Sequence, residues 1–215
     1  MGFTIGGIRE MRSGARRRGR TVGATEVAEY TGLWGWAVAP GARAAAGVCS
    51  CGDTVCDAPG AHPLDFAPEV PPGATPGTAA DAWAEVPGAS MLLPVGRSFD
   101  VLDVTEAAGR RALVRMERMG LPLGPVSVTP TGRAQFFVAP GAAAGLPGLL
   151  YRMGWDDAGL DLRALGRGAY VTAPPSDLGG LGPVRWLRPP APDTAAAPPQ
   201  ARLLLGTLAY ICHRW

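Results

Sequence analysis

The sequence contains no lysine, so all 20 of its basic residues are arginine. Together with abundant alanine, glycine and proline, this bias is typical of a GC-rich genome, and a single arginine therefore carries little functional information by itself. Glycine (31 residues) and proline (22 residues) make up nearly a quarter of the 215 residues. This composition predicts many turns and short helices and strands.

Long apolar runs are also missing. The longest, LLLGTLAYIC near the C-terminus, is about half of the roughly 20 residues that a membrane-spanning helix needs. The basic start is not followed by the apolar segment of a secretory signal. We therefore expect a soluble, cytoplasmic protein without a membrane partner, and nothing in the sequence indicates an oligomeric state.

Cysteine is scarce, and three of the four cysteines lie within eight residues. This distribution favours a metal site or reduced thiols over a disulfide framework. The pattern C-x-C-x4-C-x5-H supplies three thiolates and one imidazole, which is a suitable tetrahedral set for zinc. The alternative is a turn-rich loop with free thiols. The predicted zinc ligands are Cys49, Cys51, Cys56 and His62.

The net charge of +2 conceals an uneven distribution of charge. Residues 1–20 contain six arginines and one acidic residue, whereas the rest of the chain has 14 arginines against 17 acidic residues. One interpretation is an arm that binds a polyanion such as nucleic acid. The other is a disordered, solubilising tail. The arginines that would contact nucleic acid are Arg12, Arg16, Arg17, Arg18 and Arg20.

The order of apolar patterns and turn signals predicts an α+β fold. We expect a flexible arm at 1–24, a single domain at 25–190, and a proline-rich linker with a C-terminal helix at 191–215. Helices are predicted at 25–33, 79–86, 106–120 and 200–215. Strands are predicted at 34–40, on both sides of Gly96 within 89–105, as a hairpin at 125–140, and as a further strand pair within 159–176.

Two acidic residues stand within apolar strand patterns. In SFDVLDVT, strand alternation places Asp103 and Thr105 on one face and Asp100 on the other. A buried carboxylate has to be paired, hydrogen-bonded or bound to a metal ion. Backbone donors or an arginine could satisfy Asp103, and Asp161 could form a plain salt bridge with Arg163, two residues later.

Several segments, taken in order, carry a resemblance to a known family. They are YTGLWGWAVAPG, CSCGDTVCDAPGAHPL, SFDVLDVT, TPTGRAQFFVAP and LDLRALGRGAYVTAPPS followed by VRWL. In this order they resemble the N-terminal domain of bifunctional DNA primase/polymerases, the prim-pol branch of the archaeo-eukaryotic primase superfamily, and the cysteine-rich segment is similar to that of bacterial members. The similarity runs through most of residues 27–188.

The resemblance implies a central mixed or antiparallel sheet flanked by helices in one domain, and a role in DNA replication. It implies nucleotidyl transfer in which acidic residues hold two Mg²⁺ or Mn²⁺ ions. The first acid corresponds to Asp103 and the third to Asp161, both catalytic and metal-binding positions. A histidine that contacts nucleotide phosphates corresponds to Gln135, and Arg133 and Arg163 are further candidates for nucleotide binding. The implied partners are nucleotides and single-stranded or primer-template nucleic acid.

This sequence departs from the family pattern at polar positions. Thr105 replaces the second acid, Gln135 replaces the histidine, and Ala61 replaces a lysine in the cysteine-rich loop. The first hypothesis is a primase-polymerase-like domain with weakened or lost catalysis that still binds nucleotide or nucleic acid. The second is an active template-dependent polymerase in which Asp103, Asp161 and Glu106 hold the metal ions. The third is a scaffold that binds a protein partner.

Overall fold

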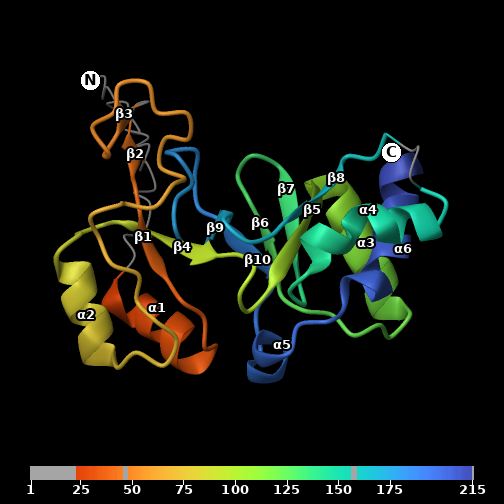
Figure 1. Cartoon of the computed structure of the whole chain (residues 1–215), viewed down its shortest axis with the longest axis horizontal. Coiled ribbons are helices and arrows are strands. Elements are labelled where there is room, and N and C mark those ends of the chain that lie inside the picture. The colour runs from red at the N-terminus through yellow and green to blue at the C-terminus, as the bar shows by residue number, and fades with distance from the viewer. Residues whose placement is uncertain (1–22, 46–47, 156–158, 215) are drawn as a thin grey trace, which may run out of the picture.

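The computed structural model describes residues 23–45, 48–155 and 159–214 (Figure 1). The arginines of the predicted nucleic-acid arm lie outside these residues. Helices and antiparallel sheets alternate along the chain, which confirms the predicted α+β class. Among the described helices, none is long and apolar enough to cross a membrane.

The larger sheet has five strands in the order β10-β6-β7-β5-β8, and every neighbouring pair is antiparallel. The predicted hairpin is confirmed as β6 and β7. β5 occupies a central position between β7 and β8, so both edges of its backbone are hydrogen-bonded within the sheet. The strands are β5 (Asp100–Thr105), β6 (Val126–Val128), β7 (Arg133–Val138), β8 (Leu162–Leu165) and β10 (Arg185–Arg188).

The smaller lobe contains a three-stranded antiparallel sheet in the order β1-β4-β9. α1 continues into a π-helical turn, η1, and α1 packs against α2 (Figure 1). A separate two-stranded ribbon, β2 with β3, begins the cysteine-rich loop. The elements are α1 (Ala24–Ala28), η1 (Glu29–Leu33), β1 (Ala39–Gly41), β2 (Ala44–Ala45), β3 (Val48–Cys49), α2 (Pro76–Ala84), β4 (Ser90–Pro94) and β9 (Tyr170–Thr172).

The strand pair predicted within 159–176 is wrong in its pairing. Its two strands, β8 and β9, lie in different sheets, where β8 pairs with β5 and β9 pairs with β4. The chain crosses between these two sheets at Gly96, at 166–169 and again between β9 and β10, and the first two crossings touch. A Cβ on Gly96 would lie 2.4 Å from the backbone N and Cα of Arg167. The short glycine-containing connection at 166–169 suggested a hairpin of β8 with β9. Instead, this connection packs against the β4–β5 connection at Gly96, and β8 and β9 pair with β5 and β4.

Three helices cover one face of the larger sheet: α3 (Glu106–Arg118), α4 (Ala142–Arg152) and α6 (Ala201–Arg214). Leu102 and Val104 of β5 are buried beneath them. The predicted C-terminal helix is confirmed as α6, which packs along α3. Its apolar side, which includes Leu204, Leu205 and Leu208, is part of the same core.

An aromatic cluster joins the two lobes. The rings of Trp36 and Phe137 stack with centroids 5.5 Å apart, and Phe99 lies 4.6 Å from Phe137. Trp36 also donates its Nε1–H to the carbonyl oxygen of Ala195 at 3.2 Å. Ala195 belongs to α5 (Pro192–Ala196), so the predicted linker contains a helix that packs on the smaller lobe.

The contact between α3 and the sheet makes a first prediction. A Cβ on Gly109 would lie 2.3 Å from the Cβ of Ala134 in β7. Gly109→Ala should therefore lower the free energy of unfolding by about 1–3 kcal/mol through overpacking. Gly206→Ala in α6 is the matched control, because nothing lies within 4 Å of the added methyl, and it should stabilise by roughly 0.5–1 kcal/mol. Urea unfolding measures both, and stabilisation by both substitutions would contradict the close contact.

Candidate functional site

A row of side chains crosses the five-stranded sheet on the face opposite the three helices. Cross-strand register places Trp186 beside Ser127, Ser127 beside Gln135, Gln135 beside Asp103, and Asp103 beside Arg163. Residues directly opposite one another in an antiparallel pair share a face. The sheet therefore brings together three of the predicted site residues, from β7, β5 and β8.

Asp103 is the centre of this row, and its side chain is 1% exposed. Its Oδ1 accepts hydrogen bonds from Arg133 Nε at 2.7 Å and from Arg163 Nε at 2.9 Å. Its Oδ2 accepts a longer bond from Gln135 Nε2 at 3.3 Å. Both oxygens are thus engaged by donors from the neighbouring strands, as a buried carboxylate requires.

Arg133 joins the two acidic residues of the site. Besides its bond to Asp103, its Nη1 donates to Asp161 Oδ2 at 2.6 Å. The Arg133 side chain is 17% exposed, whereas that of Asp161 is 58% exposed. The hydrogen bond from Arg133 lowers the pKa of the Asp161 carboxyl, and the carboxylates raise the pKa of Arg133. The guanidinium therefore lies between the two carboxylates.

Thr105 and Glu106 both serve the start of α3. The Thr105 hydroxyl accepts a hydrogen bond from the Ala108 backbone N–H at 3.3 Å, which makes Thr105 the N-cap of the helix. Glu106 accepts a bond from Arg110 Nε at 2.8 Å, one turn later on the same helix. Thr105 and Glu106 are the two residues that could take the place of the second acid. The side chains of both are bonded to α3 rather than placed to share a metal ion with Asp103.

Gln135 is fully used within the protein. Its Nε2 donates to Asp103, and its Oε1 accepts a bond from the Ser127 hydroxyl at 3.2 Å. Ser127 and Gln135 are 1% and 7% exposed. The buried Gln135 amide therefore helps to orient the Asp103 carboxylate. Sequence reasoning did not single out Ser127. Its position opposite Gln135 in the predicted hairpin was the available signal.

Asp100 lies on the other face of β5, as strand alternation predicted. It is 2% exposed, and its Oδ2 accepts a hydrogen bond from the Ala143 backbone N–H at the start of α4 at 2.8 Å. Asp100 is therefore an acidic residue that fixes a helix, separated from Asp103 by the sheet.

The acidic residues do not fit a two-metal centre. Mg²⁺ requires near-octahedral coordination by oxygen, but the oxygens of Asp103 accept bonds from three side chains and Asp161 is bound to Arg133. The charges of Arg133 and Arg163 balance those of the two carboxylates. The site therefore lacks the full set of free oxygen ligands and the excess negative charge that two divalent cations need.

The cysteine-rich loop, in contrast, has the geometry of a metal centre. The donor atoms of Cys49, Cys51, Cys56 and His62 all lie within 4.8 Å of one another. Tetrahedral zinc bound to sulfur places its ligand atoms about 3.8 Å apart, given Zn–S bonds of about 2.3 Å. The His62 Nδ1 is 2.8 Å from the Pro63 carbonyl oxygen, while Nε2 is 3.3 Å from the Cys49 sulfur. This arrangement directs Nε2 toward the thiols and suits a metal-binding imidazole.

The backbone around this loop prepares Cys49 as a thiolate. Burial alone would raise its pKa, but hydrogen bonds from the Cys51 and Gly60 backbone and from His62 outweigh this effect and lower the pKa to about 6. The contact with Cys49 raises the pKa of His62. Burial, with the neighbouring sulfurs, raises the pKa of Cys56 to about 11. The four side chains fit a structural metal ion, and their titration is linked to its binding.

The burial of Asp103 predicts unequal roles for its two arginines. Arg133→Met removes one donor from a buried carboxylate and should lower the free energy of unfolding by about 2–3 kcal/mol. Arg163→Met is the matched control, because the Arg163 side chain is 63% exposed and its loss should cost at most about 1 kcal/mol. Urea unfolding at neutral pH compares the two, and equal losses would contradict the assignment.

The contribution of the Arg133–Asp161 ion pair to stability depends on pH. The pKa of Asp161 is lower in the folded protein than in the unfolded chain, so the pair stabilises the fold above the ordinary carboxyl pKa of about 4. This contribution disappears as the pH falls through the lowered value. The stability difference between wild type and Arg133→Met should therefore shrink below about pH 4.

A comparison with known protein families identifies the family of this chain. The family model described as "Bifunctional DNA primase/polymerase, N-terminal" matches residues 27–201, which is most of the chain. Comparisons with curated proteins and with solved structures gave no match. The ordered motifs predicted this family, and the match confirms it. The chain therefore belongs to the family of bifunctional DNA primase/polymerase N-terminal domains.

Proposed function

We propose that this chain is a primase-polymerase domain that has lost metal-dependent nucleotidyl transfer and binds nucleic acid without extending it. The observation that carries the proposal is the Arg133 guanidinium, which hydrogen-bonds Asp103 and Asp161 at 2.7 and 2.6 Å. Two catalytic metal ions stabilise charge on both the attacking and the leaving oxygen. A guanidinium neutralises the same carboxylates but has no coordination position to offer to a substrate oxygen.

The polar positions of the site support the proposal because each has acquired another partner. Thr105 caps α3, and Gln135 is held between Asp103 and Ser127. These substitutions leave the apolar framework of the sheet unchanged. The selective replacement of metal-binding and phosphate-binding groups is what we expect when chemistry is lost and the fold is kept.

Binding of nucleic acid is supported by arginines that remain available near the site. Arg163 keeps 63% of its side chain exposed while its Nε holds Asp103. Its terminal nitrogens are suited to a phosphate, because a guanidinium binds oxyanions through parallel hydrogen bonds. The arginines of the N-terminal arm would add contacts that are independent of sequence.

We further propose that the metal held by Cys49, Cys51, Cys56 and His62 is zinc and that its role is structural. Four protein ligands complete a tetrahedral shell, which leaves no position for a reacting water. The loop is fixed to the smaller lobe by the bond from Ala42 N to His62 O at 2.9 Å. Zinc would therefore stabilise this loop and supply no chemistry to the sheet face.

The catalytic half of the proposal predicts an inert wild type. No template-dependent incorporation of dNTP or NTP should occur with Mn²⁺ on a primed or unprimed template. Thr105→Asp with Gln135→His should also be inert, since aspartate at an N-cap binds the helix as threonine does and Arg133 still lies between the acids. Adding Arg133→Ser should free Asp161 and leave Asp103 with Arg163 as its remaining cation, and should yield Mn²⁺ binding that calorimetry detects in this triple variant alone.

Asp103→Ala is the control for this assay. Wild-type incorporation that Asp103→Ala abolishes would refute the loss of catalysis, whereas incorporation that persists in Asp103→Ala indicates a contaminating polymerase. The binding half is tested separately by fluorescence anisotropy with a labelled single strand. A wild type that binds no nucleic acid at 50 mM salt would refute it and favour the scaffold hypothesis.

The metal centre predicts about one zinc ion per chain in purified protein. Cys51→Ser should reduce the zinc content and lower the melting temperature, because a structural zinc ion contributes on the order of 10 kcal/mol to the folding of its loop. Cys212→Ser is the matched control, since Cys212 lies in α6 outside the cluster. Elemental analysis below about 0.2 zinc per chain would contradict the site.

A further inference from the structure

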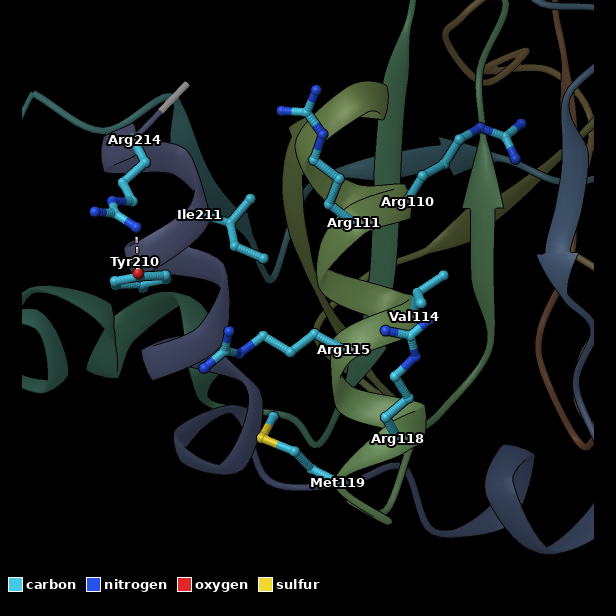
Figure 2. Close-up of a pocket in the computed structure, with 9 residues that line it drawn as sticks. All are labelled: Arg110, Arg111, Val114, Arg115, Arg118, Met119, Tyr210, Ile211 and Arg214. Atoms are coloured by element: carbon cyan, nitrogen blue, oxygen red, sulfur yellow. Dashed lines mark hydrogen bonds between the residues drawn. The ribbon is translucent and has the colours of Figure 1, made fainter.

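A groove runs between α3 and α6 on the outer side of the helical layer (Figure 2). Its volume is about 860 Å³, and five arginines line it. Among the described residues that line the groove there is no carboxylate. The arginines are Arg110, Arg111, Arg115 and Arg118 from α3 and Arg214 from α6.

The arginines of α3 are arranged by helical periodicity. Positions 111, 115 and 118 are separated by four and three residues, so their side chains lie along one side of the helix. Figure 2 shows Arg115 extending from α3 toward α6. The resulting charge is concentrated along the groove, where a polyanion would be bound at several points at once.

The groove also contains an aromatic ring held between cations. The Arg115 and Arg214 guanidinium carbons lie 5.5 and 5.2 Å from the centre of the Tyr210 ring. Arg214 also donates to the Tyr210 hydroxyl at 2.7 Å. These contacts orient both guanidinium groups and keep the ring at the surface, where it is 38% exposed.

The lining between the charged groups is apolar and accessible. Val114 is 47% exposed and Met119 is 48% exposed. An occupant with anionic groups on one side and flat apolar groups on the other satisfies both features. Single-stranded nucleic acid has this chemistry, with phosphates for arginine and bases that stack on aromatic and guanidinium planes. A membrane surface supplies anionic groups but cannot enter a groove between helices.

The groove and the candidate site lie on opposite sides of the sheet and approach each other only where β5 leads into α3. α3 starts directly after Thr105, which lies opposite Arg133 in the β5–β7 pair, and Arg110 follows one turn later. We propose that the α3–α6 groove binds single-stranded nucleic acid, with phosphates on Arg115, Arg118 and Arg214 and a base against Tyr210. This inference rests on the proposed nucleic-acid binding and adds the path of the strand.

The test uses the full chain and a labelled 20-nucleotide oligo(dT) in fluorescence anisotropy at 50 and 200 mM salt. Arg115→Gln/Arg118→Gln/Arg214→Gln should reduce the salt slope of log affinity by about 2, since each phosphate contact on a single strand contributes about 0.7. Wild-type affinity should then fall about 15-fold more than that of this groove variant between the two salt concentrations. Urea unfolding verifies that both proteins are folded.

Two controls test whether the effect depends on the position of the arginines and on the Tyr210 ring rather than on the total charge of the protein. Arg43→Gln/Arg152→Gln/Arg167→Gln removes the same charge outside the groove and should leave the slope within about 0.5 of wild type. Tyr210→Ala should weaken binding about tenfold through lost stacking, whereas Tyr210→Phe should retain wild-type affinity.

The outcomes distinguish this inference from the proposed function. A wild type that binds oligo(dT) with the same slope as the groove variant would overturn the groove while leaving nucleic-acid binding intact. A wild type that binds no oligo(dT) would overturn both. Binding of poly-glutamate or of phosphatidylglycerol vesicles that the groove variant loses, without any change in oligo(dT) binding, would assign the groove to an acidic protein or a membrane and refute the proposal.

Discussion

The pairing of Asp103 with Arg133 is the constraint on which the larger sheet depends. An ionised carboxylate that is 1% exposed is costly unless charged donors surround it. The donors come from β7 and β8, on either side of β5. A shift of one residue in either register would turn these side chains to the opposite face and leave Asp103 without them. The polar face thus fixes the register from one side of the sheet, and the helical core fixes it from the other.

The same pairing determines what the face can bind. Two arginines and two carboxylates in contact have no net charge, so the centre of the site lacks the excess negative charge that favours metal cations. Five arginines instead line the groove between α3 and α6, and no carboxylate is among the described residues that line it. This arginine-lined groove lies on the outer side of the helical layer, so the sheet separates it from the row of side chains around Asp103.

The sequence predicted the elements of the site better than their connections. Strand alternation placed Asp103 and Asp100 on opposite faces, and the motifs brought Asp103 and Asp161 together. The sequence suggested Arg163 as the partner of Asp161, because it is two residues away, but the bond is made by Arg133 on another strand. Cross-strand neighbours depend on register, which tertiary packing decides. The N-cap role of Thr105 was predictable, since threonine at the first turn of a helix commonly caps it.

The two sets of potential metal ligands in this chain give opposite results under the same chemical criterion. The donor atoms of the cysteine-rich loop face one another within 4.8 Å, and backbone N–H groups stabilise the thiolate form of Cys49 that a metal requires. The carboxylates of Asp103 and Asp161 share Arg133 as a partner, so a side-chain cation already occupies the place between them. Proximity of ligand types is therefore insufficient to identify a metal centre, because the donors must also be unpaired. By this criterion the four side chains of the cysteine-rich loop fit a metal ion, whereas the carboxylates of Asp103 and Asp161 are held by Arg133.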